Sequence, residues 1–162
     1  MKTISVVDYG MGNLFSVKRA LQSLGVNVEF INTPEQSAQS GHLILPGVGA
    51  FVDGMKELHS RQLVEPLQRH AASGKPFLGI CLGMQMMSGI GEEFGETPGL
   101  NIIEGKVSVL PHTTTDGEKI RVPNIGWCAL ERTEAFPEWK GTLLEGLNPG
   151  TSAYFVHSYA VR

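Results

Sequence analysis

Apolar and polar positions follow two different periods along the chain, and the first half shows both in turn. Short apolar runs typical of strands occur at residues 4–7, 26–31, 42–45 and 76–80. Helical patterns follow at residues 14–24, from Thr33 onward, and at 50–58, 62–72 and 82–88. Asn13 and Thr33 are placed to cap their helices, and Gly25 is placed to end the first one. Strands that alternate with helices predict an α/β fold with a mostly parallel sheet flanked by helices.

The pattern changes from about Gly99 onward. Strand-like runs separated by turns lie at residues 102–110, 119–122, 127–131 and 153–161. We expect these strands to form a mostly antiparallel extension of the same domain. Because no repeat, linker or low-complexity segment interrupts the chain, we expect residues 1–162 to form a single domain.

The charge and the composition exclude two classes of partner. Thirteen Lys and Arg against sixteen Asp and Glu give a net charge of −3, and basic residues never cluster in more than two, so nucleic acid is not an expected partner. No apolar run approaches the length of a membrane span, and Asp8 ends the N-terminal apolar run after a few residues. We therefore expect a cytoplasmic protein without membrane contact, in which Cys81 and Cys128 need not form a disulfide.

The segment Gly79-Ile80-Cys81-Leu82-Gly83 carries the strongest chemical signal. It lies where a strand meets a helix, and a nucleophile on such a sharp turn needs small residues on both sides, because strand and helix approach closely. Unpaired amides at the start of a helix favour a thiolate at Cys81. The amide of Leu82 can also point at a developing oxyanion. The segment predicts a nucleophilic cysteine.

A buried structural cysteine is the alternative interpretation of Cys81. Free cysteines are among the most buried residue types, and an isolated Gly-x-Cys-x-Gly would favour that reading. The position after the fourth strand of an α/β sheet changes the balance, because ligands gather at the carboxyl ends of the strands. Cys128 has no such context and is interpreted as a packing residue.

The segment Pro46-Gly47-Val48-Gly49 is the candidate for a second oxyanion donor. It ends the third strand, and Gly47 and Gly49 let the backbone turn an amide toward a cleft without a side-chain clash. An ordinary glycine-rich turn would be the better interpretation of this segment alone. Together with Cys81 in the same layer, the segment favours an oxyanion hole formed by Gly47, Val48, Gly49 and Leu82.

Neither a cofactor nor a metal is expected. A dinucleotide-binding Gly-x-Gly-x-x-Gly would need glycine at Phe15 or at Val52, and no Gly-Lys-Ser/Thr loop occurs. The histidines are scattered without the spacing of a metal site: His42, His59, His70, His112 and His157. Only His157, beside the apolar run 154–156, is placed for a role.

Four segments together resemble the class I glutamine amidotransferases, a family with a flavodoxin-like fold. In chain order they are Asp8-Tyr9-Gly10-Met11-Gly12-Asn13-Leu14, Pro46-Gly47-Val48-Gly49-Ala50-Phe51, Gly79-Ile80-Cys81-Leu82-Gly83-Met84-Gln85 and Tyr154-Phe155-Val156-His157-Ser158-Tyr159. Within that class, Val48 and Met84, where many relatives have Pro and His, resemble the glutaminase subunit of imidazole glycerol phosphate synthase, from histidine biosynthesis.

The resemblance implies a reaction and a partner. Cys81 would attack the side-chain amide of glutamine, form a glutamyl thioester and release ammonia. The substrate would be held by Gln85, His157, Ser158 and Tyr159. Ammonia would pass to a (βα)8-barrel cyclase subunit in a heterodimer, and Asn13, Asn124 and Trp127 would lie near that partner. The family more often has His at the place of Asn124 and Asn at that of Cys128.

The resemblance also implies a His and a Glu that activate the cysteine, in a His-Pro-Glu segment about two strands beyond Tyr159. The 162 residues contain no His-x-Glu, and His157 corresponds to a residue on the substrate side rather than to the catalytic histidine. We therefore expect that the family's C-terminal segment is lacking. General acid–base help is worth about 10²–10⁴-fold, so a polypeptide of only these residues is expected to turn over glutamine poorly.

Three alternatives stay open at this point. The chain could be the glutaminase of another synthase, which the identity of the stimulating partner would distinguish. It could be a non-catalytic module that docks on a synthase. A thiol hydrolase or chaperone-like cysteine protein could also share the strand–turn–helix segment, although residues 46–49 and 157–159 argue against it.

Overall fold

The computed structural model describes residues 2–162 and divides the chain into two compact units. Unit 1 runs through Val109 and includes Ala160–Arg162, and unit 2 is Leu110–Tyr159. Each unit has secondary structure of its own. That residues 1–162 act as a single domain stays a prediction.

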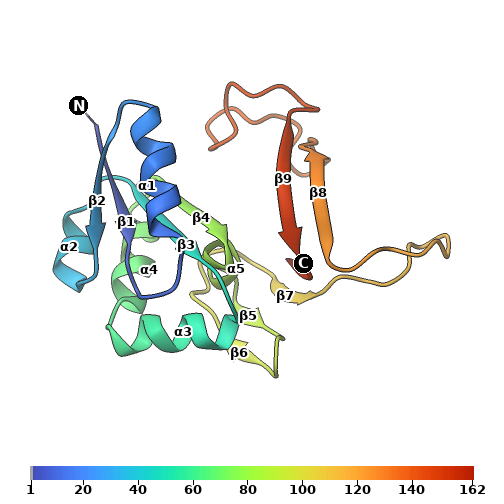
Figure 1. The fold of residues 1–162 in the computed structure, drawn as a ribbon, viewed down its shortest axis with the longest axis horizontal. Helices are drawn as coiled ribbons and strands as arrows, with labels where there is room; N and C mark the ends of the chain where they lie inside the picture. Colours follow the sequence, from blue (N-terminus) through green and yellow to red (C-terminus); the bar gives the residue numbers. More distant parts are fainter. Residues whose placement is uncertain (1) are drawn as a thin grey trace. The chain divides into compact units, whose positions relative to one another are not determined.

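Unit 1 is built on a parallel four-stranded sheet with the order β2-β1-β3-β4 (Figure 1). Its strands are β1 (Thr3–Val7), β2 (Asn27–Ile31), β3 (Leu43–Gly47) and β4 (Phe77–Cys81). Its helices are α1 (Leu14–Ser23), α2 (Pro34–Gln39), α3 (Phe51–Ser60), α4 (Val64–Ala72) and α5 (Leu82–Met86). The predicted alternation of strands and helices is confirmed, with boundaries that differ by a few residues.

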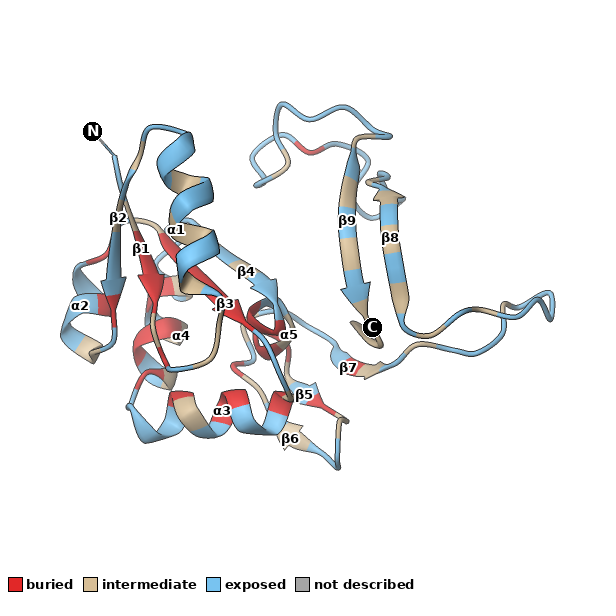
Figure 2. Ribbon diagram, in the orientation of Figure 1, coloured by how far each residue is buried: buried red, intermediate tan, exposed pale blue. Residues whose placement is uncertain are grey.

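The core of unit 1 lies around β1 and β3, where buried residues gather (Figure 2). Every residue of β3 is buried, and Val7 and Leu45 are fully inaccessible. The outer strands, by contrast, leave Phe30, Leu78 and Ile80 between 38 and 39% exposed. The central strands are therefore buried on both faces, as parallel strands usually are, and the outer strands are only partly covered.

The predicted helix caps are present. The Asn13 side chain accepts a hydrogen bond from the backbone N–H of Ser16 at 3.2 Å. Thr33 forms a capping box with Gln36, so that the first turn of α2 has partners for two otherwise unpaired donors. Gly25 follows α1 with φ of 73°, the left-handed conformation that glycine favours at the end of a helix.

A second sheet in unit 1 has the order β10-β7-β5-β6. Its strands are β5 (Ile90–Gly91), β6 (Thr97–Pro98), β7 (Lys106–Val109) and β10 (Tyr159–Val161), of which β10 begins at the last residue of unit 2. The first two were not predicted, because two-residue strands carry no periodic signal. The strand expected at 102–110 is shorter, and β7 pairs with β5 in parallel, which corrects part of the antiparallel expectation.

Unit 2 contains a two-stranded antiparallel hairpin of β8 (Asn124–Ala129) and β9 (Ser152–His157). The strand expected at 127–131 therefore begins earlier, and the one expected at 153–161 is interrupted at Ser158. The strand expected at 119–122 is wrong: Lys119 forms only an isolated bridge to Thr113. The residues between Thr113 and Lys119 form a tight turn. Residues 119–122 therefore have only a single bridge, and not a longer strand, as a pairing partner.

None of the helices described between residues 2 and 162 is long and apolar enough to cross a membrane.

Candidate active site

Cys81 ends β4 and is the N-cap residue of α5, so the predicted strand-to-helix turn is present. Its backbone has φ of 54° and ψ of −118°, a conformation that non-glycine residues rarely adopt. Such strain persists only where the surroundings impose it, and it is a recurrent feature of nucleophiles held on a sharp turn. Cys81 is also exposed, so a reagent from solvent can reach the thiol.

The two glycines around Cys81 are required by close backbone contacts. A Cβ atom on Gly83 would overlap the carbonyl oxygen of Leu45 in β3, and one on Gly79 would overlap the Cα atom of Met84 in α5. Neither neighbour can move without shifting a strand or a helix. The sequence argument that strand and helix approach closely here is confirmed.

The candidate oxyanion loop begins directly beside Cys81. In the parallel register of β3 and β4, Gly47 is the partner of Cys81. Val48 is 53% exposed, and Gly49 has φ of 98°, which requires glycine. The side chain of Leu82 is buried, which fixes the start of α5, where its amide lies. The structure thus brings Gly47, the start of the predicted loop, into register with the predicted nucleophile.

Tyr9 is a residue of this region that the sequence analysis did not single out as functional. Its side chain is fully buried, and its hydroxyl has no hydrogen-bond partner among the described residues. A Cβ atom on Gly47 would lie 2.5 Å from that hydroxyl. Burial raises the pKa of Tyr9 above its ordinary value, and the negative charge of a Cys81 thiolate raises it further. Tyr9 thus keeps its proton close to the site.

Glu93 is a second residue that the sequence analysis missed. Its Oε2 atom accepts a hydrogen bond of 3.0 Å from the backbone N–H of Phe51, the first residue of α3. Ala50, the N-cap of that helix, offers no side-chain bond. Glu93 therefore caps the helix that follows the candidate oxyanion loop. The two residues are 42 positions apart, so no local pattern could reveal the contact.

Two further residues of unit 1, Gln85 and Asn13, were predicted to contact the substrate and the partner. Gln85 lies on α5 and is half-buried. Asn13 is exposed, and its side-chain oxygen caps α1. A role of Asn13 toward a partner would therefore involve the loop and helix start that it stabilises.

In unit 2, His157 is held at both ring nitrogens. Its Nε2 lies 3.1 Å from the side-chain nitrogen of Asn124, and its Nδ1 lies 2.9 Å from the carbonyl oxygen of Tyr159. An amide nitrogen can only donate and a carbonyl oxygen can only accept, so Nδ1 carries the proton and Nε2 accepts. Both ring nitrogens of His157 therefore already have partners within unit 2.

Asn124 and Trp127 lie on opposite faces of the hairpin. Side chains alternate along a strand, and the register pairs Asn124 with His157 and Trp127 with Tyr154. Asn124 also donates weakly to the sulfur of Cys128, at 3.8 Å. The predicted partner residues of unit 2 therefore divide into a half-buried polar face and an exposed aromatic one.

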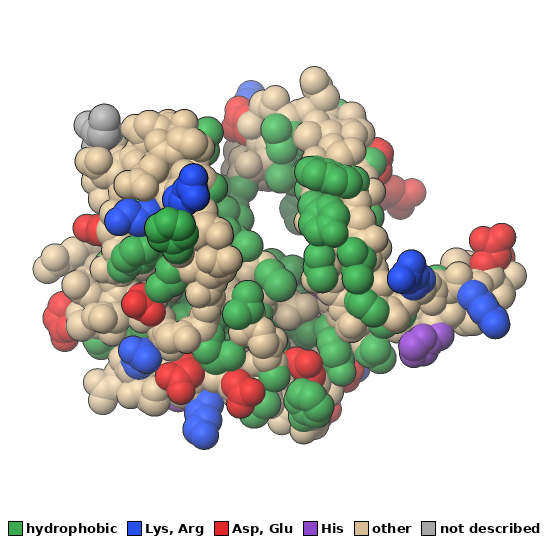
Figure 3. Space-filling view, viewed as in Figure 1, with side chains coloured by type: hydrophobic (Ala, Val, Ile, Leu, Met, Phe, Trp, Pro, Cys, Tyr) green, Lys and Arg blue, Asp and Glu red, His purple; other side chains and the backbone are tan. Residues whose placement is uncertain are grey.

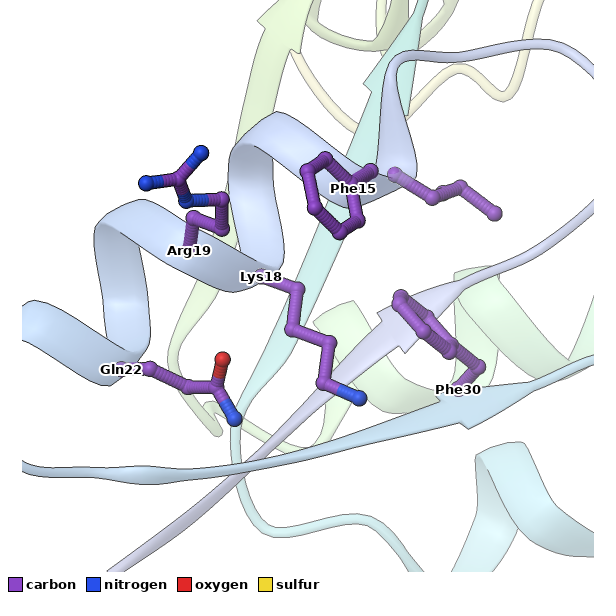
Figure 4. Close-up of a pocket in the computed structure, with 6 residues that line it drawn as sticks. Phe15, Lys18, Arg19, Gln22 and Phe30 are labelled. Atoms are coloured by element: carbon purple, nitrogen blue, oxygen red, sulfur yellow. The ribbon is translucent and has the colours of Figure 1, made fainter.

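A separate pocket of about 430 Å³ lies beside α1 and β2 (Figure 4). Lys18 lies over the ring of Phe30 and Arg19 over that of Phe15, at 5.6 and 5.7 Å from the centroids. None of the predicted site residues lines it. Among residues 2–162, no three His, Cys, Asp or Glu side chains are grouped as metal ligands would be.

A family model described as "Glutamine amidotransferase class-I" matches residues 5–162. The chain therefore belongs to the class I glutamine amidotransferases, which are enzymes. The predicted membership is confirmed.

Its similarity to individual relatives is more specific. "Imidazole glycerol phosphate synthase subunit HisH 1" of Legionella pneumophila (strain Paris) is 47% identical over 159 residues, which are 98% of this chain and 75% of the relative. The HisH protein of Aquifex aeolicus (strain VF5) is 44% identical over 162 residues, covering 99% of this chain and 72% of that one. The resemblance to this glutaminase, inferred from four segments, is confirmed over nearly the whole chain.

Solved structures support the fold. A structure titled "Crystal structure of glutamine amidotransferase" has a TM-score of 0.70 at 19% identity, over 98% of this chain and 73% of that one. A putative GMP synthase protein of Thermoplasma acidophilum has a TM-score of 0.61 at 18% identity, over 99% of this chain and 67% of that one. At these identities the likeness shows the fold alone, and it confirms the expected α/β architecture.

Proposed function

We propose that this chain hydrolyses glutamine through a Cys81 thioester and supplies ammonia to the cyclase of imidazole glycerol phosphate synthase. The single observation that carries the proposal is the strained, exposed Cys81, in register with Gly47 at the start of a glycine loop. The similarity to relatives named as HisH subunits of that synthase supports the choice of the partner. The proposal places the pair, a heterodimer, in histidine biosynthesis in the cytoplasm.

The chemistry follows from the order in which bonds change. The thiolate of Cys81 attacks the side-chain carbonyl carbon of glutamine, and the carbonyl oxygen becomes an oxyanion. The amide of Leu82 and an amide of the loop Gly47–Val48–Gly49 stabilise that oxyanion, which donors held in place do without reorganising. The leaving nitrogen takes a proton from water as the carbon–nitrogen bond breaks, so that ammonia departs and the glutamyl thioester remains. Water attacks the thioester, releases glutamate and restores the thiol.

The substrate contacts belong to the same proposal. Gln85 and the segment His157–Tyr159 hold the glutamine, and the orientation of the His157 ring is fixed by partners at both of its nitrogens. A ring held at both nitrogens can orient the groups that it contacts. The resemblance gives the acid–base role to a His-Pro-Glu segment, and we assign that role to no residue of this chain.

The partner surface that we propose is the exposed face of the β8–β9 hairpin. Ile125, Trp127, Tyr154 and Val156 alternate onto this face and are between 53 and 72% exposed. Figure 3 shows hydrophobic side chains gathered along the hairpin. Exposed aromatic and aliphatic residues in one patch are typical of a protein–protein interface. We assign this face to the (βα)8-barrel cyclase.

Labelling with 6-diazo-5-oxonorleucine, an electrophilic glutamine analogue, tests the nucleophile. We expect covalent modification at Cys81, protected by glutamine and absent from the Cys81→Ser variant, while Cys128→Ser retains it. Peptide mass spectrometry locates the adduct. Equal modification of both thiols, or none at Cys81, would overturn the proposal.

Stimulation by a partner tests which synthase is served. The test uses a chain extended through a His-Pro-Glu segment, because residues 1–162 alone are expected to turn over glutamine poorly and without stimulation. We expect the cyclase of imidazole glycerol phosphate synthase to raise the release of glutamate by the extended chain, with the synthase component of anthranilate synthase as a control. Stimulation by the control alone would assign the chain to another synthase. The absence of any stimulation, together with selective labelling of Cys81, would contradict the ammonia-supplying role only.

A further inference from the structure

The hydroxyl of Tyr9 lies next to Gly47, the register partner of Cys81. Tyr9 follows β1 at the carboxyl end of the sheet, and its side chain has no exposed surface. The position that a Cβ atom would take on Gly47 is 2.5 Å from this hydroxyl and 2.8 Å from the backbone nitrogen of Gly83. Gly47 is in turn the register partner of Cys81. One buried hydroxyl therefore adjoins both backbone segments that hold the proposed nucleophile.

Packing alone does not account for this hydroxyl. The Tyr9 oxygen is one of the buried side-chain polar atoms without a hydrogen-bond partner among the described residues. Burying an unpaired hydroxyl costs free energy, and phenylalanine would fill nearly the same space without that cost. A polar atom in this position needs an explanation other than the filling of the core.

The lack of a partner leaves the hydroxyl free to respond to charge. Its proton rotates about the C–O bond, so that the dipole can turn toward a negative group. The raised pKa of Tyr9, caused by burial and secondly by the charge of Cys81, means that the proton stays on the oxygen while a thiolate is present. Tyr9 is then a neutral donor in a water-poor environment, where such dipoles act strongly.

We propose that Tyr9 is a positioning residue whose buried hydroxyl stabilises the thiolate of Cys81. It acts through Cys81 and does not touch glutamine. The inference rests on the proposed function in one respect, namely that Cys81 is the nucleophile.

Other ionisable groups lie in the segments near Tyr9, and a phenylalanine at position 9 would not remove any of them. The Asp8 carboxylate accepts from the N–H of Gly10. Arg61 and Glu57 of the α3 region lie 3.0 and 3.9 Å from the place of a Cβ on Gly10, and they pair at 3.5 Å. Glu93 is bonded to the start of α3. A phenylalanine at position 9 removes the hydroxyl and leaves these groups in place.

The test compares Tyr9→Phe with the parent chain, both carrying Cys128→Ser so that a single thiol reports. The rate of alkylation by iodoacetamide is followed from pH 5 to pH 10. We expect the pH midpoint of the reaction to rise by about half a unit to one unit, with a threefold to tenfold slower reaction below the midpoint. An unchanged midpoint would overturn the inference. A rate that falls equally at every pH would also overturn it, because that result indicates distortion of the turn.

Two controls separate this effect from others. Ser37→Ala removes another buried hydroxyl that has no hydrogen-bond partner among the described residues, on α2, and is expected to leave the midpoint unchanged. Incorporation of 3-fluorotyrosine at position 9 makes the phenol a stronger donor and is expected to lower the midpoint. A midpoint that rises or stays constant in that variant contradicts the inference, even if Tyr9→Phe fails to fold. Since iodoacetamide does not resemble glutamine, the result is independent of labelling by the glutamine analogue, which tests the nucleophile itself.

Discussion

The turn around Cys81 and the β8–β9 hairpin differ in how closely other parts of the chain contact them. At the turn, Gly47 and Gly83 lie where an added Cβ would meet backbone or buried atoms, and Leu82 is almost completely buried. On the hairpin, Gly126 has no neighbour within 4 Å of such an atom, and Trp127 is 72% exposed. Backbone contacts within unit 1 specify the turn. The hairpin places its large apolar side chains where an external surface can meet them.

The difference separates the surroundings of the proposed nucleophile from those of the proposed partner surface. Strain at Cys81 persists because contacts between β3, β4 and α5 impose it. The hairpin needs only its register and its alternation to present an aromatic face. Substitutions at the turn should therefore affect folding, and substitutions on the hairpin face should affect binding.

Gly83→Ala tests this contrast with the largest expected effect. The new methyl group would overlap the Leu45 carbonyl oxygen, so that β3 and α5 must separate. We expect a loss of more than about 3 kcal/mol in the free energy of unfolding, measured by urea denaturation, or a failure to fold. Gly41→Ala is the control, because nothing lies within 4 Å of its added Cβ. Equal stability of the two variants would contradict the account of the turn.

Trp127→Ala tests the hairpin face. If Trp127 is an anchor of the cyclase interface, its truncation should weaken the complex by about 2 kcal/mol, roughly thirtyfold in Kd, as measured by calorimetry. The free energy of unfolding of the isolated chain should change by less than about 0.5 kcal/mol. Phe136→Ala, in the same unit and 65% exposed, is the control that should leave affinity unchanged. Weakening of equal size in both variants would argue against the assigned face.

His70 gives unit 1 a predicted dependence of its stability on pH. It is buried on α4, its Nε2 lies 3.2 Å from the Pro76 carbonyl oxygen, and its Nδ1 has no partner among the described residues. Burial lowers the pKa of His70 from its ordinary value of 6.5, and the nearby charge of Lys75 contributes. Below pH 6.5 the unfolded chain therefore binds a proton that the folded chain does not, and stability falls as the pH falls.

The measurement is urea unfolding at pH 7.5 and pH 5.5. We expect the parent chain to lose stability at the lower pH, and His70→Phe to lose less, because its ring can still pack beside Phe77 without binding a proton. His59→Gln, at an exposed position of α3, should retain the parent's dependence. An identical dependence in all three proteins would show that His70 is not the responsible group.

Cys128→Ser should have the smallest effect. Cys128 is half-buried on the hairpin and receives only a weak bond from Asn124, which a serine hydroxyl can also accept. We expect a change within about 0.5 kcal/mol in the free energy of unfolding. Labelling of Cys81 by the glutamine analogue should be unchanged by mass spectrometry. A loss of labelling would link the turn to the hairpin, against the independence expected of the two regions.

Much of unit 1 could be predicted because its signals are local. The caps at Asn13 and Thr33 and the alternation of strands with helices depend on residues close in sequence. Strands of two residues, such as β5, have no period to detect, and the strand expected at residues 119–122 forms only one bridge in the structure. In unit 2 the first and last residues of each strand depend on pairing with the other strand, and the sequence of one strand alone does not determine that pairing.

Sequence alone was enough to identify the class of protein, the nucleophile Cys81 as a prediction and the order of the segments around it. These follow from short motifs, because their glycines and apolar runs favour a particular local backbone conformation. The folded chain was needed to show the positive φ of Cys81, its register with Gly47, the cap that Glu93 provides and the unpaired hydroxyl of Tyr9. Each of these depends on residues far apart in the chain, and such contacts exist only once the sheet has formed and buried them.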